Sequence, residues 1–220
     1  MEHPAYINYW KRKKLLSTSV PAFPRRKWWP TDSLSDIESE YFRTVKSAAN
    51  ILDVGAGDLR VMRKFQAAGF SGEYHTQDIG TEFEYTYKDL SEVTGVYEAV
   101  ICLDVIEHLY LENGLGLLIR LTELVRPGGV LLLQTPNGRC IRNPLGNDMT
   151  HLHLYNLPDL WAFLVALGFE VEGFRVVFQA KERLSLSSSL ASCVGRFVTA
   201  RLLGADYAEN IAILAKKSTL

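Results

Sequence analysis

The sequence predicts an α/β protein: a seven-stranded, mostly parallel sheet with helices on both faces and an antiparallel strand pair near the C-terminal end. Three observations support this prediction. Residues 48–180 alternate short apolar stretches with stretches of helical periodicity, as repeated strand–helix–strand units do. A glycine-rich turn joins the first apolar stretch directly to a helical pattern. Two further strand-like stretches, 170–179 and 208–216, form the expected antiparallel pair.

The remaining elements follow in chain order. Strands are expected at 51–54, 73–77, 85–87, 99–103 and 130–135. Helices are expected from the cap residues 31–33 to about residue 46, directly after the glycine turn, at 113–124 and at 159–167. Pro158 lies in the first turn of the last helix and Gly168 ends it, which is where these two residue types are favoured.

The segment 51–58, Ile-Leu-Asp-Val-Gly-Ala-Gly-Asp, is the most informative part of the chain. A buried strand ends in Asp53, and Gly55 and Gly57 then form a tight turn into a helix. Glycine is required there because the backbone must turn sharply and a ligand must approach without a Cβ in its way. The turn by itself predicts a nucleotide-like ligand.

The charges around the turn restrict the classes of ligand that could bind there. Asp78 ends the second strand, 21 residues after Gly57, where an acidic side chain can accept hydrogen bonds from ribose hydroxyls. A dinucleotide fingerprint would have a third glycine, but this chain has Arg60 there, and Asp58 places a negative charge beside the turn. A pyrophosphate would be repelled, whereas a positively charged, phosphate-free nucleoside would be attracted.

This succession of motifs resembles the class I S-adenosylmethionine-dependent methyltransferases, specifically the small-molecule branch that includes the ubiquinone-biosynthesis O-methyltransferases. The resemblance covers about residues 48–180 and implies a Rossmann-like sheet that binds S-adenosylmethionine and releases S-adenosylhomocysteine. It assigns the methionine end of the donor to one group of residues: Asp53, Gly55, Ala56, Gly57 and Leu103. It assigns the ribose to Asp78 and the adenine to three positions: Ile79, Asp89 and Leu90. Two alternatives remain: Asp78 could cap a helix instead of binding the ribose, and Asp89 could be a solvated turn residue instead of meeting the adenine.

Three histidines are candidates for removing a proton from a hydroxyl acceptor. His151 and His153 follow the fifth strand in a loop at the carboxyl edge of the sheet, where ligands of open α/β sheets bind. Related methyltransferases carry a similar Thr-His stretch, so His151 is the first candidate base, with His153 second. His108 ends the segment 104–108, Asp-Val-Ile-Glu-His, at a strand–helix junction above the donor. Each of the three could instead be structural, pinning a loop or capping a helix.

A metal site is not expected. His151, His153 and Asp148 could be imagined as ligands, but their alternating spacing suits a catalytic zinc cage poorly. The three cysteines have no Cys-x-x-Cys spacing, so the sequence indicates neither a disulfide framework nor a structural zinc. A cytoplasmic protein with reduced thiols is expected.

Composition excludes several classes. The chain has 220 residues, 47% of them hydrophobic and 22% charged, with a formal net charge of −1, which is ordinary for a globular protein. No apolar run approaches the roughly 20 residues of a membrane span. The basic and aromatic residues of 1–47 could suggest nucleic-acid binding, but the remaining residues cancel this charge, and no nucleic-acid partner is expected.

The chain divides into two parts. Residues 1–47 are expected to be a basic, aromatic cap that folds over the donor and contributes rings, and 48–220 the donor-binding domain. A helical insertion at 181–207 is expected to pack on its own domain, and a lid or a homodimer face is the alternative.

The expected activity is methyl transfer to a small-molecule acceptor, at an oxygen of a sugar, a lipid-linked glycan or an aromatic metabolite. Two rival functions remain: a non-catalytic S-adenosylmethionine-binding regulatory protein and a nicotinamide-dependent oxidoreductase.

Overall fold

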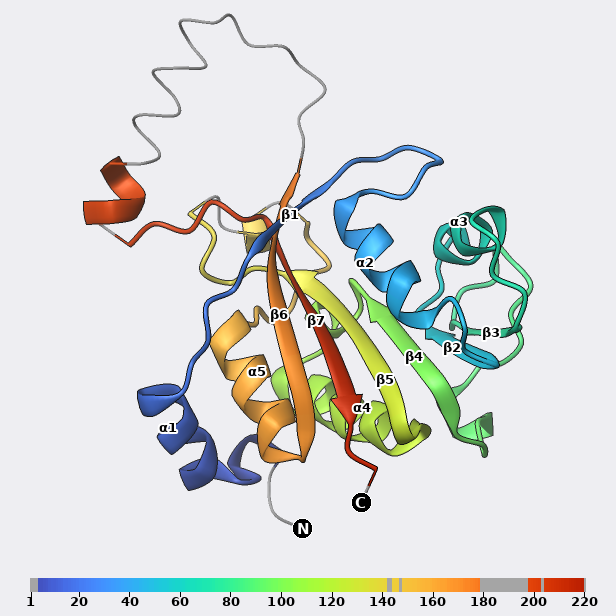
Figure 1. The fold of residues 1–220 in the computed structure, drawn as a ribbon, viewed down its shortest axis with the longest axis horizontal. Helices are drawn as coiled ribbons and strands as arrows, with labels where there is room; N and C mark the ends of the chain where they lie inside the picture. Colours follow the sequence, from blue (N-terminus) through green and yellow to red (C-terminus); the bar gives the residue numbers. More distant parts are fainter. Residues whose placement is uncertain (1–3, 142–143, 147, 179–197, 203, 220) are drawn as a thin grey trace, which may run out of the picture.

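A computed structural model of the protein describes residues 4–141, 144–146, 148–178, 198–202 and 204–219 (Figure 1). Its sheet has seven strands in the order β1-β6-β7-β5-β4-β2-β3. The strands are β1 (Arg25–Trp28), β2 (Asn50–Val54), β3 (Glu73–Gln77), β4 (Tyr97–Leu103), β5 (Val125–Pro136), β6 (Phe169–Phe178) and β7 (Asn210–Lys217). The α-helices with assigned bounds are α1 (Tyr9–Thr18), α2 (Asp36–Val45), α3 (Arg60–Ala67), α4 (Leu111–Leu124) and α5 (Leu157–Ala166).

The predicted fold class is confirmed. Strand β7 runs antiparallel to both β5 and β6, and all other pairings between named strands are parallel. The helices lie on both faces, because successive side chains of a strand point to opposite sides. Leu52 and Val100 pack under α4 and α5, whereas their neighbours Ile51 and Ile101 pack under α2 and α3.

One of the seven strands differs from the expectation. The stretch 85–87 forms only an isolated parallel bridge, between Tyr87 and Gln77, because a 3-10 helix begins three residues later at Leu90. The other edge of the sheet gains β1, whose Arg25 pairs with Arg175 of β6. The sequence of β1, Arg-Arg-Lys-Trp, has no apolar run, since an edge strand needs only one neighbour and little burial.

The helices begin near their expected positions, with differences set by their caps. Helix α2 starts at Asp36 because the side chain of Ser35, rather than residues 31–33, accepts the N–H of Glu38 in a capping box. Helix α5 starts at Leu157 because Asn156 caps it, and Gly168 follows it with φ +94°, as expected.

Helix α1 lies along α5, at the side of the molecule away from α3 (Figure 1). Lys11 Nζ and Asn8 Nδ2 both donate to the carbonyl of Ala166, 2.8 and 3.2 Å away, so the arm satisfies an open carbonyl at the C-terminal end of α5. Most of the expected insertion at 181–207 lies outside the described residues. None of the helices in the described part combines the length and apolar character needed to cross a membrane.

A buried ion pair fastens α2 to α3. Both side chains are about 95% buried, and Lys64 Nζ lies 2.8 Å from Glu38 Oε1. Glu38 Oε2 also accepts the N–H of Ser35, so this one carboxylate holds the start of α2 and the middle of α3 together.

We expect Lys64→Met to lower the free energy of unfolding by about 3–5 kcal/mol, because it leaves a buried carboxylate without its cation. Urea denaturation measures this. The matched double variant Glu38→Gln/Lys64→Met removes both charges and should recover at least half of the loss. A loss below about 1 kcal/mol in the single variant would contradict this role of the pair.

Candidate active site

Three strands bring one side chain each, two polar and one apolar, to the same face of the sheet at its carboxyl edge. Asp53 points to the α2–α3 face because Ile51, two residues earlier, does. Leu103 of β4 and Gln134 of β5 are paired in register and lie on the same face. The three side chains therefore gather where ligands of open α/β sheets bind.

The glycine turn closes this edge above β2. Gly55 has φ +72° and Gly57 φ +49°, backbone conformations that favour glycine. A Cβ added to Gly55 would lie 2.2 Å from Cγ2 of Val105. The N–H groups of Gly55 and Ala56 both donate to the carbonyl of Gln77, which ties the turn to the end of β3. The glycines thus keep the turn open to a ligand and close to its neighbours.

Asp53 is held out of water below the turn. Its carboxyl accepts a hydrogen bond from Tyr74 Oη at 2.8 Å. Burial, opposed in part by that hydrogen bond, raises the pKa of Asp53 to about 7. The group would therefore gain from a cationic ligand, which favours its ionised form.

A cavity of about 210 Å³ lies between the glycine turn, α2 and α3, and we call it the turn pocket. Its lining consists of Trp28, Glu38, Tyr41, Asp53, Gly55, Ala56, Gly57, Asp58, Arg60, Val61, Leu103, Asp104 and Gln134. Four of these side chains are acidic and only Arg60 is basic, although Glu38 is already paired with Lys64. The turn pocket therefore favours cations over phosphate groups.

A chain of hydrogen bonds crosses the mouth of the turn pocket. Tyr41 Oη donates to Gln134 Oε1 at 3.2 Å, and Gln134 Nε2 donates to Asp104 at 2.9 Å. Asn210 Nδ2 donates to the second oxygen of Asp104 at 2.8 Å. The sequence analysis did not predict any of these residues as part of the site. Asp104 alone could have been found from the sequence, because it directly follows β4 at the carboxyl edge of the sheet.

One ring of the N-terminal arm reaches the turn pocket. Trp28, at the end of β1, lines it, and the guanidinium carbon of Arg60 lies 5.7 Å from the centre of its ring. The arm thus contributes a wall of the site through a strand of the sheet, while its helix α1 packs elsewhere.

The sequence-predicted residues divide into two groups. Asp53, Gly55, Ala56, Gly57 and Leu103 line the turn pocket. Asp78 adjoins it: its carboxylate accepts the N–H of Gly57 at 2.8 Å and that of Gly80 at 2.7 Å.

The other three predicted residues lie outside the lining of the turn pocket. Ile79 is 86% exposed, and Asp89 caps the 3-10 helix Leu90–Glu92 through the N–H of Ser91. Leu90 packs against the core under α4.

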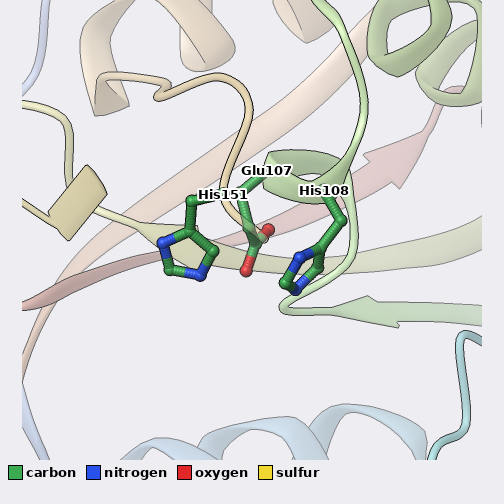
Figure 2. A group of neighbouring side chains, drawn as sticks. All are labelled: Glu107, His108 and His151. Atoms are coloured by element: carbon green, nitrogen blue, oxygen red, sulfur yellow. The ribbon is translucent and has the colours of Figure 1, made fainter. Parts of the chain in front are cut away.

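Figure 2 shows the carboxyl group of Glu107 between the imidazole rings of His108 and His151. The two ring centres are 5.1 Å apart. His108 follows β4, whereas His151 comes from the loop after β5, so the fold brings together two of the three predicted histidines. The tripartite cluster with Glu107 was not predicted.

Each ring has one nitrogen with a hydrogen-bond partner and one without a partner among the described residues. His108 Nδ1 lies 3.2 Å from the carbonyl of Thr150, and His151 Nδ1 lies 3.0 Å from that of Pro144. A carbonyl only accepts, so each Nδ1 carries a hydrogen, and in the neutral form of the ring Nε2 is the acceptor. Nε2 can therefore take a proton or bind a metal ion.

Glu107 is fully buried, and burial next to Asp104 raises its pKa to about 8. Thr135 Oγ1 donates to its Oε2 at 2.9 Å, but Oε1 has no hydrogen-bond partner within the described residues. One ligand atom from each of Glu107, His108 and His151 lies within 4.8 Å of the others, so the cluster could hold a metal ion.

His153 is separated from this cluster. Its ring packs against Tyr155, with 4.8 Å between the ring centres, and it lines a different cavity beside α1. Burial lowers its pKa. The structure thus places the second candidate base away from the first.

A cavity of about 290 Å³ lies beside His151, and we call it the His151 cavity. It is lined by Pro136, Cys140, Pro144, His151, Phe178, Glu209 and Asn210. Asn210 also donates a hydrogen bond to Asp104, which lines the turn pocket. This hydrogen-bonded pair therefore lies between the two cavities.

The sheet, its glycine turn and the acidic pocket at its carboxyl edge define a Rossmann-like protein whose ligand site lies where such folds bind nucleosides. A family model described as "Methyltransferase domain" matches residues 30–173. The chain belongs to this methyltransferase-domain family.

Individual relatives are more distant. Two ubiquinone biosynthesis O-methyltransferases, from Rickettsia canadensis (strain McKiel) and Rickettsia conorii (strain ATCC VR-613 / Malish 7), are each 27% identical over 106 residues. These matches cover 41% of this chain but only 44% and 36% of the two relatives, less than half of their length.

Solved structures share the fold. A SAM dependent methyltransferase from Archaeoglobus fulgidus has a TM-score of 0.64 and 18% identity, covering 82% of this chain and 93% of that one. The plantazolicin methyltransferase BpumL, in complex with a monoazolic desmethylPZN analog and SAH, has a TM-score of 0.53 and 13% identity, covering 83% of each chain.

We expect Glu107→Gln to stabilise the protein increasingly as the pH rises from 5 to 8. In this range the unfolded state has lost the Glu107 proton and the native state retains it, so wild-type stability falls with pH. Glutamine cannot ionise and escapes this loss. Urea denaturation at several pH values should show a difference that grows by at least about 1 kcal/mol. A difference independent of pH would show that Glu107 titrates normally.

Proposed function

We propose that the protein transfers a methyl group from S-adenosylmethionine to an oxygen of a small molecule, leaving S-adenosylhomocysteine. The acidic lining of the turn pocket is the observation that carries this proposal. Asp53, Asp58 and Asp104 surround a cavity whose only basic side chain is Arg60. A ligand with a sulfonium and an ammonium group would be held there by charge, and a pyrophosphate would be repelled.

The ribose of the donor would meet Asp78. This half-buried carboxylate already accepts two backbone N–H groups, but each of its oxygens has a further lone pair for a hydroxyl. Adenine recognition by Ile79, Asp89 and Leu90 requires the segment 79–90 to cover the ligand. That segment is tied to the turn by Tyr85 Oη, which donates to the carbonyl of Gly57 at 2.7 Å.

The acceptor would bind in the His151 cavity, next to the donor. Phe178, Pro136 and Pro144 give this cavity apolar walls, and His151 and Glu209 supply its ionisable groups. Among the acceptor classes, a hydroxylated aromatic metabolite suits such walls better than a bare sugar. The names of the relatives, O-methyltransferases of ubiquinone biosynthesis, agree with transfer to oxygen.

The chemistry needs positioning and one proton transfer. The carbon–sulfur bond of the sulfonium breaks as the acceptor oxygen forms its bond to the methyl carbon, in line with the departing sulfur. The hydroxyl proton passes to Nε2 of His151, with His108 as the neighbouring second base. The sulfonium becomes a neutral thioether, so one of the two positive charges that the turn pocket attracts is lost on reaction, while the ammonium group remains.

The first test is donor binding measured by isothermal titration calorimetry with S-adenosylmethionine, S-adenosylhomocysteine and NAD. We expect both adenosine thio compounds to bind and NAD not to bind. The affinity for S-adenosylmethionine should rise as the pH increases from 5.5 to 7, because Asp53, with its pKa of about 7, ionises over this range. The limiting slope is about tenfold per pH unit.

Asp53→Asn is the matched control, since asparagine keeps an oxygen for Tyr74 but cannot ionise. It should bind the donor more weakly and with a flatter pH profile. Binding of NAD in place of the thio compounds would reject the proposal in favour of a nicotinamide-dependent enzyme. Donor binding without methyl release to any acceptor would favour the regulatory protein.

The second test separates His151 from other ways of removing the proton. With an acceptor found by methyl release across a panel of hydroxylated compounds, we expect His151→Ala to lower kcat about 10²–10⁴-fold. Donor affinity should change less than about twofold. The matched variant His153→Ala should lose far less, because its ring faces another cavity. Equal losses in both variants would contradict the assignment.

A metal ion held by Glu107, His108 and His151 is the second candidate for this step, favoured by the unpartnered Oε1 of Glu107. Chelation with EDTA followed by re-addition of Mg²⁺, Mn²⁺ or Zn²⁺ distinguishes the two. Activity that is lost and restored would assign the step to a metal, and unchanged activity would leave it to His151 alone.

A further inference from the structure

A third cavity, remote from the turn pocket, lies between α1, α4 and α5, and we call it the α1 cavity. Its volume is about 280 Å³. It is lined by Ala5, Tyr9, Arg12, Lys13, Leu16, Leu111, Leu115, His153, Leu154, Tyr155, Asn156, Asp159, Leu160 and Phe163. Helices α4 and α5 cover the opposite face of the sheet from α2 and α3, so the two sites share no lining residue.

Most of the wall is apolar. Leucines from three helices, Leu16, Leu115 and Leu160, and the ring of Phe163 contribute to it. An alkyl chain that binds against this wall leaves water, and each methylene group buried raises the binding affinity about fourfold. The cavity therefore suits an alkyl chain.

A cationic group lies against this wall. The guanidinium carbon of Arg12 is 5.3 Å from the centre of the Phe163 ring, and one Nη of Arg12 donates to the carbonyl of Ala5. Its Nε is buried and has no hydrogen-bond partner in the described part of the chain. A buried guanidinium N–H without an acceptor is costly, and an anionic oxygen is the acceptor that it pairs with best.

Tyr155, another residue of the lining, carries a second unpartnered donor. It is only 6% exposed, and its Oη makes no hydrogen bond to any described residue. The hydroxyl lies against α4, so close to Gly114 that an added Cβ there would come within 2.1 Å of it. Two residues of the lining thus carry buried polar groups without a partner in the described part of the chain.

The charges of the lining favour an anion. Arg12 and Lys13 are cationic, and Asp159 is the single acidic side chain. Asp159 is engaged as well, because its carboxylate accepts from Asn156 Nδ2 at 2.5 Å. Burial lowers the pKa of His153, which favours its neutral form. Two positive charges against one negative charge leave a net positive lining.

We propose that the α1 cavity binds a single-chain amphiphile with an anionic head group. The head group pairs with Arg12 Nε and Lys13, and the chain lies among Leu16, Leu115, Leu160 and Phe163. This ligand could be a free fatty acid or an anionic lipid of a membrane surface, since both offer a charged oxygen and an alkyl chain.

The test uses the full chain and titration calorimetry with laurate below its micelle concentration, and with octanoate for chain length. We expect laurate to bind and octanoate to bind much more weakly. Arg12→Gln should weaken laurate roughly tenfold or more, and Tyr155→Phe about threefold. Lys14→Gln, an exposed lysine of the same helix outside the cavity lining, is the matched control and should bind as the wild type does.

Three results would overturn the proposal: no binding of laurate, unchanged binding in Arg12→Gln, or equal binding of dodecyltrimethylammonium. Sedimentation with phosphatidylglycerol vesicles distinguishes the two sources. Vesicle binding together with laurate binding assigns a membrane lipid, laurate binding alone assigns a free acid, and vesicle binding alone rejects the cavity as the site. Affinity for S-adenosylhomocysteine should stay the same in Arg12→Gln, so this test and that of the proposed function fail independently.

Discussion

The burial of a single carboxyl group, that of Asp53, constrains the rest of the site. A parallel strand covered on both faces carries this acid to the edge of the sheet, where Tyr74 is its one hydrogen-bond donor among the described residues. Ionising a buried carboxyl without a nearby cation is unfavourable, which is why its pKa is raised. The glycine turn above it leaves room for a ligand, and a cationic ligand would stabilise the ionised form of this carboxyl.

The same pattern recurs at Glu107, a buried carboxyl with one unpartnered oxygen. Both acids lie at strand ends, one at β2 and the other just after β4. Buried carboxyls with raised pKa values lie at this edge, as is common at functional sites. The ion pair of Glu38 and Lys64 shows the contrast, because there the fold supplies the partner itself.

The sequence predicted what local patterns encode. Apolar runs predicted the five central strands, because alternating burial and parallel pairing leave few other arrangements. The glycines and Asp53 predicted the edge of the sheet at which the turn pocket lies. It did not predict β1, whose polar residues carry no strand pattern and whose partner lies 150 residues along the chain. The sequence therefore indicated that rings of the N-terminal arm reach the donor, but not that Trp28 is the ring that lines the turn pocket.

The histidines show a second limit. In a regular strand, His151 and His153 would share a side, but the N–H groups of Leu152 and His153 both donate to the single carbonyl of Glu107. These two hydrogen bonds to one carbonyl twist the segment, so His151 and His153 line different cavities. Such a deviation depends on a carbonyl more than forty residues earlier, so no local pattern of the sequence encodes it.

The pairing of β1 with β6 bears on how the protein matures. Parallel neighbours so distant in the chain cannot meet until residues 169–178 have left the ribosome. Until then the indole of Trp28 has no fixed place, and the turn pocket lacks one wall. The pocket is thus completed late in folding, after the strands β2, β4 and β5 that form its floor have all been synthesised.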